Sequence, residues 1–142
     1  MFMGEYSHSI DAKGRLIVPA KFREQLGGEF VITKGLDGCL FAYSNEEWKT
    51  IEEKFRQMPP TRESRKFFRF FVAGANTVEF DKQGRILITA KLREHAGLQK
   101  DVVLAGVINR IEIWDKDRWE DNSSYEDVDE IAEHMADLGL AL

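Results

Sequence analysis

The chain has 142 residues, of which 43% are hydrophobic, with a formal net charge of −5 and one cysteine. This is enough for one compact domain or two small coupled ones, and no run of about 18 apolar residues could span a membrane. The single Cys39 excludes an internal disulfide and fits a reducing compartment. The N-terminus shows no basic-then-apolar leader, so we expect a cytoplasmic protein.

The charge is unevenly distributed. Residues 112–142 hold eleven acidic and two basic residues, a net charge of −9, which leaves +4 for residues 1–111. Because charges act over roughly 8–10 Å in physiological salt, the local sign matters more than the total. The acidic total therefore does not exclude a nucleic-acid partner for the first 111 residues.

After a first segment, residues 1–8, that favours a strand, the chain contains a sequence repeat. Ile10–Gly27 aligns without gaps on Phe80–Gly97, with eight of 18 positions identical, and Gly35–Trp48 aligns on Gly106–Trp119 one residue out of phase. This extent of matching indicates an internal duplication.

Each copy begins with Asp, two variable residues, Gly, Arg and an apolar run, at residues 11–18 and 81–88. This pattern predicts a tight hairpin followed by a strand. Gly14 and Gly84 would supply the positive φ that such a turn needs. Asp11 and Asp81 would accept hydrogen bonds from the amides of the turn.

The rest of each copy reads as a short helix and two strands. In the first copy Pro19 opens a helix over Ala20–Leu26 that Gly27 ends, and in the second Thr89 caps the equivalent helix up to Gly97. The predicted strands are Phe30–Thr33 and Cys39–Tyr43, and again Val102–Ala105 and Arg110–Trp114.

Two helices are predicted between the copies. The capping box Ser44–Glu47 starts the first, whose apolar stripe is Trp48, Ile51, Phe55 and Met58, and Pro59-Pro60 ends it. The second covers Thr61–Phe71, with Phe67, Phe68 and Phe71 expected to pack inward and Arg62, Arg65, Lys66 and Arg69 outward. Stacking of these Phe residues on single-stranded nucleic acid is the less favoured interpretation.

The C-terminal part is predicted to contain two short helical segments. Asp115 would cap a turn that contains Trp119, and Ser124 would cap a last helix that Gly139 ends. One face of this helix is apolar and the other acidic, so we expect it to dock on its own body or on a neighbouring subunit. Its apolar residues are Tyr125, Val128, Ile131, Met135 and Leu138.

The two Asp–Arg motifs are the candidate functional residues. Paired hairpins would present Arg15 and Arg85 side by side, with Lys13 and Lys82 at the same turns, and Arg suits phosphate groups and guanine edges. The alternative is a purely structural ion pair, which contributes about 0–1 kcal/mol. His8, His95 and His134 lack partners at metal-ligand spacing, and no catalytic pattern stands out. We therefore expect no enzyme, cofactor or metal, and treat a nuclease as a weak alternative.

The whole chain resembles the MraZ family of bacterial transcriptional regulators, which are built from two SpoVT/AbrB-type units. The resemblance rests on the two motifs at residues 11–15 and 81–85, on the opening Met1–Tyr6 and on the length. It implies a swapped-hairpin β-barrel, ring-shaped oligomers, and DNA binding upstream of the division and cell-wall gene cluster. It assigns DNA contact to Arg15, with Arg85 as its partner.

We therefore expect a mainly β fold with short helices (α+β): a tandem, pseudo-twofold AbrB-like barrel with linking helices and a C-terminal helix. The expected units are AbrB-type repeats at 5–47 and 76–119, a helical linker at 48–75 and an acidic tail at 120–142. The expected function is sequence-specific repression of its own operon and of the gene cluster, by a homo-oligomeric ring on promoter direct repeats at the nucleoid. The alternative is an oligomeric interaction scaffold with structural repeats only.

Overall fold

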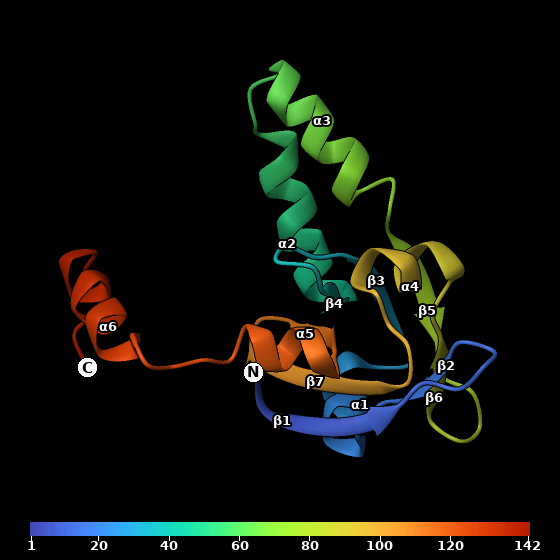
Figure 1. Cartoon of the computed structure of the whole chain (residues 1–142). Coiled ribbons are helices and arrows are strands. Elements are labelled where there is room, and N and C mark those ends of the chain that lie inside the picture. Colours follow the sequence, from blue (N-terminus) through green and yellow to red (C-terminus); the bar gives the residue numbers. More distant parts are fainter.

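The computed structural model describes all 142 residues, in eight strands and six helices (Figure 1). The strands are β1 (Phe2–Ser9), β2 (Arg15–Ile17), β3 (Glu29–Lys34), β4 (Leu40–Ser44), β5 (Asn76–Glu79), β6 (Arg85–Leu87), β7 (Asp101–Ile108) and β8 (Ile111–Asp115). The helices are α1 (Ala20–Leu26), α2 (Asn45–Arg56), α3 (Arg62–Phe71), α4 (Ala90–Ala96), α5 (Lys116–Asp121) and α6 (Val128–Asp137). None of these helices is both long and apolar enough to cross a bilayer.

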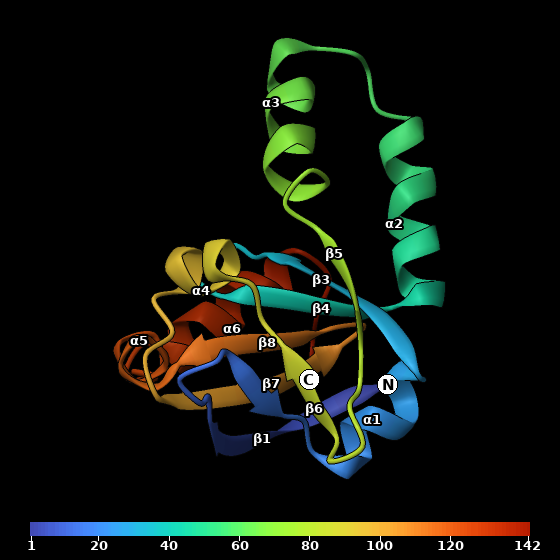
Figure 2. The same cartoon turned by 90° about the vertical axis from the view of Figure 1, so that its right-hand side faces the viewer.

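The two copies exchange their first strands. Six strands form an antiparallel sheet in the order β1-β7-β8-β4-β3-β5, and β2 pairs with β6 in a second, two-stranded sheet (Figure 2). Thus β1 of the first copy extends the β7–β8 hairpin of the second, and β5 of the second extends the β3–β4 hairpin of the first. The order is symmetric about the β4–β8 pair. The predicted mainly β, duplicated and swapped fold is confirmed.

Hydrogen bonding does not close these strands into a barrel, so this part of the expectation is wrong. The two sheets remain open. A single β-bridge pairs Ile10, which follows β1, with Leu16 in β2. The reason is that β2 and β6 have three residues each and turn at once into α1 and α4. Pro19, which follows the first of these strands, has no N–H to continue a ladder.

Both sheets nevertheless enclose one core. A single cluster of 19 buried residues contains Leu16 and Ile86 from the ribbon β2–β6, Phe22 and Leu92 from α1 and α4, and Ile32 among those from the large sheet. These five side chains are at most 1% exposed, and burying each contributes roughly 1.5–3 kcal/mol. Neither copy could therefore keep its core after separation, because each supplies part of the other's.

Helices α2 and α3 form a hairpin that projects from the sheet (Figures 1 and 2). The predicted capping box forms, since the Ser44 Oγ accepts a hydrogen bond from the Glu47 N–H at 3.3 Å. At the base, the Trp48 ring stacks on Phe71 with centroids 5.6 Å apart. Phe71 is buried as expected, but Phe67 is 37% and Met58 51% exposed. The outer half of the hairpin lies beyond the sheet, so it has no body to bury these residues against.

A buried hydrogen bond ties this hairpin to the sheet. Thr33, in β3, is fully buried and its hydroxyl donates to the carbonyl oxygen of Phe71 at 2.6 Å. Thr33→Val should lower the free energy of unfolding by about 1–3 kcal/mol, because the Phe71 carbonyl at the helix end would be left unsatisfied. Chemical denaturation measures this loss. Thr77→Val, at an exposed position of β5, is the control, and equal effects of the two changes would contradict the assignment.

The C-terminal region departs from expectation in two ways. Asp115 caps α5 through the Asp117 N–H as predicted, but Ser124 does not cap α6. The chain first makes a turn, with the Val128 N–H bonded to the Tyr125 carbonyl at 3.2 Å, and α6 begins only at Val128. All residues of α6 are exposed, and the helix stands clear of the body on an extended segment (Figure 1). Within one chain, the apolar face of α6 has no partner.

Candidate nucleic-acid interface

The two motif turns have nearly identical geometry. The Asp11 carboxylate accepts hydrogen bonds from the backbone N–H groups of Lys13 at 3.0 Å and Arg15 at 2.8 Å. Asp81 accepts the equivalent bonds from Gln83 and Arg85, both at 2.9 Å. The glycines before the arginines have φ values of 85° and 76°, a region in which an L side chain is strained. The turn backbone is therefore fixed by the Asp and Gly of each motif.

The same carboxylates hold the arginine side chains. Arg15 Nε lies 2.7 Å from Asp11 Oδ2, and Arg85 Nε lies 2.8 Å from Asp81 Oδ2. The backbone hydrogen bonds from the two arginines, followed by the side-chain ones, hold the pKa of both carboxyl groups below the ordinary value of 3.8. The pairing uses Nε, so the Nη1 and Nη2 edge of Arg15 has no partner within the chain. A guanidinium oriented in this way is ready for a bidentate acceptor.

The pairing of β2 with β6 sets where the arginines lie. Arg15 is opposite Leu87, and Ile17 is opposite Arg85. Since side chains alternate along strands, these four residues share the outer face, while Leu16 and Ile86 face the core. The two arginines are thus diagonal neighbours, about 7–8 Å apart at Cα, rather than directly side by side. Ile17 and Leu87 occupy the other diagonal of this face and are 42% and 57% exposed.

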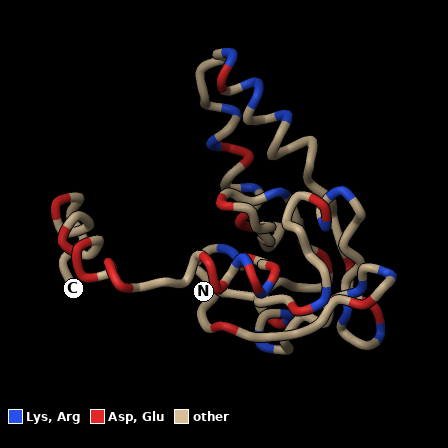
Figure 3. The backbone as a smooth tube through the Cα atoms, viewed as in Figure 1, with Lys and Arg blue, Asp and Glu red and all other residues tan.

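Lys13 and Lys82 lie exposed in the two turns, beside the arginines. Figure 3 shows both basic and acidic residues at the end of the molecule that carries these turns, whereas the acidic C-terminal helix lies on the opposite side. Residues 11–15 and 81–85 each hold two basic residues and one acidic residue, so each turn has a net charge of +1 although the chain is acidic overall. No group of three or more His, Cys, Asp and Glu side chains is placed to hold a metal ion.

Each turn is supported by the helix of the other copy, which sequence reasoning missed. A Cβ on Gly14 would collide with the guanidinium of Arg93, in α4, and one on Gly84 would lie 2.8 Å from Cζ of Arg23, in α1. Arg23 and Arg93 donate to the carbonyls of Val18 at 2.7 Å and Ile88 at 2.8 Å, respectively. The one signal in the sequence was that Arg23 and Arg93 are identical in the repeat alignment.

The lowered carboxyl pKa values predict a dependence of stability on pH. A depressed pKa in the folded state stabilises the fold above the ordinary value of 3.8, and this contribution disappears as pH falls through the folded value. Asp11→Asn with Asp81→Asn should therefore lower the melting temperature at pH 7, and the difference from wild type should close as the pH falls below the ordinary carboxyl pKa of 3.8. Thermal melts across this range test it. Glu24→Gln with Glu94→Gln, also repeat-equivalent, is the control; a gap independent of pH would refute the assignment.

Two exchanged β units, with a pair of Asp-held arginines on a shared two-stranded ribbon, define the class of this chain as a duplicated, strand-exchanged β protein. A family model described as MraZ protein matches residues 1–70 and again residues 71–139. The transcriptional regulator MraZ of Lachnoclostridium phytofermentans is 60% identical over 141 residues, covering 99% of both chains. Those of Thermoanaerobacter sp. strain X514 and Acetivibrio thermocellus are 60% and 59% identical over 143 residues, covering 99% of this chain and 100% of theirs. The chain belongs to the MraZ family, a family of transcriptional regulators and not of enzymes.

Proposed function

We propose that this chain regulates transcription by binding double-stranded DNA sequence-specifically through the ribbon β2–β6. The observation that carries the proposal is the pair of arginines, each oriented by its own Asp, on the outer face of a two-stranded ribbon. The major groove of B-DNA admits such a ribbon, and Arg bonds bidentately to the O6 and N7 atoms of guanine. Arg15 and Arg85 are the proposed base readers.

The neighbouring residues fit this role. Lys13 and Lys82 are exposed at the turns, where they would contact phosphates on either side of the groove. Ile17 and Leu87 are exposed apolar residues beside the arginines on the same face, and an apolar side chain can contact the methyl group of thymine. The ribbon thus offers groups for guanine, thymine and phosphate within a few residues.

One ribbon makes a small contact, so affinity must come from several subunits that bind together. We propose a homo-oligomeric ring with head-to-tail contacts, which presents identical ribbons in one direction. Such a series suits direct repeats about one helical turn apart, whereas a twofold dimer would suit a palindrome. The proposed targets are the chain's own promoter and the division and cell-wall gene cluster, repressed by promoter occupancy at the nucleoid in the cytoplasm.

A gel-shift titration with the DNA upstream of the chain's own gene, at two salt concentrations, tests this function. We expect the DNA affinity to fall steeply as the salt concentration rises. Each phosphate contacted should add about −0.9 to the slope of log affinity against log salt. A shuffled DNA of equal length should bind much more weakly. If the chain is instead an interaction scaffold, which its two unpartnered apolar surfaces would suit, neither DNA should bind in a salt-dependent manner.

A further inference from the structure

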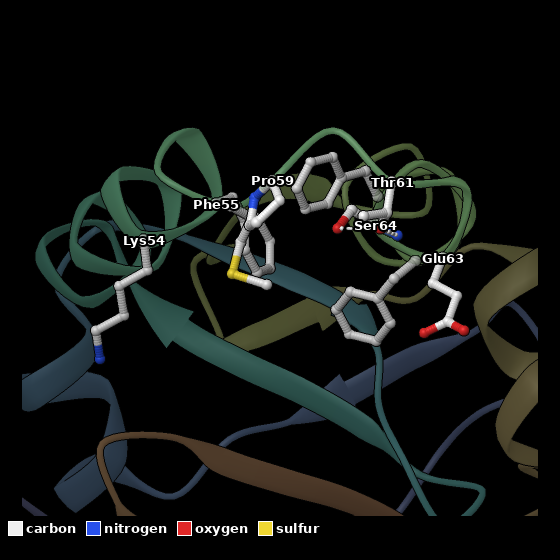
Figure 4. Close-up of a pocket in the computed structure, with 9 residues that line it drawn as sticks. Lys54, Phe55, Pro59, Thr61, Glu63 and Ser64 are labelled. Atoms are coloured by element: carbon white, nitrogen blue, oxygen red, sulfur yellow. Dashed lines mark hydrogen bonds between the residues drawn. The ribbon is translucent and has the colours of Figure 1, made fainter.

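The outer half of the helical hairpin carries an apolar groove of about 480 Å³ between α2 and α3. Phe55, Met58, Phe67 and Phe68 line it, with the charged Lys54 and Glu63 at opposite sides (Figure 4). Met58 is 51% and Phe67 37% exposed. We call this surface the hairpin groove. Because it lies beyond the sheet, no other part of the same body covers it.

The C-terminal helix carries the second uncovered apolar surface. Val128, Ile131 and Met135 follow one another at helical spacing and are 44%, 47% and 39% exposed. Residues 125–137 hold six acidic residues and neither Lys nor Arg. An amphipathic helix of this kind binds by laying its apolar face into a groove between other elements. The length of α6, ten residues, allows about three turns of contact.

We propose that α6 of one copy of this chain docks into the hairpin groove of a second copy. This inference rests on the oligomer of the proposed function and names the contact that builds it. The two surfaces are both apolar, and a helix lying between α2 and α3 would complete a three-helix packing arrangement. Val128, Ile131 and Met135 would then cover Met58 and Phe67.

Charge selects this partner over the alternatives. The two helices of the hairpin, residues 45–71, hold seven basic and five acidic residues, a net charge of +2, and four of the basic residues lie on α3. The hairpin therefore attracts the six acids of residues 125–137. Pairing of α6 with α6 of another copy would bring two such acidic segments together and is therefore disfavoured. Figure 3 shows the contrast between the basic residues along α3 and the acidic residues of α6.

The path of the chain favours a second copy over the chain's own groove. Residues 122–127, which connect α5 to α6, run outward from the body, and α6 lies well away from the hairpin (Figure 1). Helix α5 itself is fixed, because Trp119 packs against a smaller, separate cluster of six buried residues that includes Phe71 and Trp114. The ring centroids of Trp119 and Trp114 are 5.8 Å apart. The helix is thus presented to a neighbour. Repetition of this contact around a series of copies would generate head-to-tail assembly.

Disulfide trapping between two singly substituted copies tests the contact. Met58→Cys and Ile131→Cys replace exposed residues, so both variants should fold, which circular dichroism checks. The native Cys39 does not interfere, because burial raises the pKa of its thiol to about 12. When the two variants are mixed and oxidised, we expect a disulfide-linked product of twice the chain mass. A bond requires Cα atoms within about 7 Å, so a product reports close contact.

Ile108→Cys, at a site 71% exposed at the end of β7, replaces Met58→Cys in the matched control and should give no product with Ile131→Cys. Absence of the Met58–Ile131 product, or equal yield in the control, would overturn the proposal. So would a doubly substituted chain that closes the disulfide only within itself. DNA binding is measured separately, on the reduced wild type. If the disulfide-linked product forms but the wild type does not bind DNA, the proposed function is wrong and the docking of α6 still holds.

Discussion

Replacing Arg15 with Ala is expected to abolish specific DNA binding while the chain stays folded. Arg15 lies on the outer face of the ribbon, and the side chains of Arg15 and Asp11, which form an ion pair, are each 36% exposed. Loss of this ion pair should therefore cost about 0–1 kcal/mol of stability. A bidentate contact to guanine is worth roughly 1–3 kcal/mol of discrimination. In an oligomer every subunit would lose it. Several small losses then add up to near-complete loss of operator affinity.

The salt dependence separates the two roles that Arg15 could have. If it neutralises a phosphate, the slope of log affinity against log salt should flatten by about 0.9 for each phosphate that Ala leaves unpaired. If it reads a base, the slope should hold while the difference between operator and random DNA collapses. Arg85→Ala should act in the same direction with a smaller effect, because the Gln83 side chain already accepts a hydrogen bond from Arg85 Nη2. The assay is a salt-titrated binding measurement with circular dichroism.

Arg56→Ala is the matched control, because Arg56 ends α2 with its side chain 74% exposed and only a 4.0 Å contact to Glu52. It removes the same charge from a surface outside the ribbon. The Arg15→Ala and Arg85→Ala proteins could instead stay folded and bind operator DNA as tightly as wild type, with the same salt slope. That result would show that the two motifs are structural turns without a role in DNA binding.

Gly14→Val is expected to have the largest effect on stability. The residue has φ of 85°, where a β-branched side chain costs about 1–3 kcal/mol. Its Cβ would also lie 2.8 Å from the Ile88 carbonyl oxygen and collide with the Arg93 side chain, which adds about 1–3 kcal/mol of overpacking. Together these terms should lower the melting temperature by roughly 5–20 °C.

Two further glycines separate backbone strain from the collision. Gly27 has φ of 82° and a Cβ added to it would meet nothing within 4 Å, whereas Gly28 has neither a positive φ nor a neighbour at that distance. Gly27→Val should therefore cost the strain alone, and Gly28→Val close to nothing. Gly84→Val should fall between Gly27→Val and Gly14→Val, because it meets only the flexible Arg23 side chain. Thermal melts that rank Gly28→Val with Gly14→Val would disprove the assigned turn geometry.

Local signals were sufficient for most of the elements. The helix α1 has the predicted bounds. Thr89 caps the start of α4 by accepting a hydrogen bond from the Leu92 N–H at 3.4 Å, and Gly97 ends this helix in the left-handed region, at φ 61°. These features depend on residues within one or two turns of one another, so a short window of sequence contains their physical causes. The failure at Ser124 shows the limit, since a competing turn at Tyr125 displaced the cap by three residues.

What the sequence by itself determined is the duplication, the two Asp–Gly–Arg turns and the helical hairpin between the copies. The tertiary structure alone decided that β1 pairs with β7 and β5 with β3, that the sheets stay open, and that the two arginines are diagonal neighbours, each opposite an apolar residue. It also placed Arg23 and Arg93 over the turns of the opposite copy. The physical reason is that strand edges offer the same backbone groups whichever partner they meet, so register and exchange depend on contacts far apart in the chain. Equally, an amphipathic helix such as α6 reveals that it needs a partner, but not which surface supplies one.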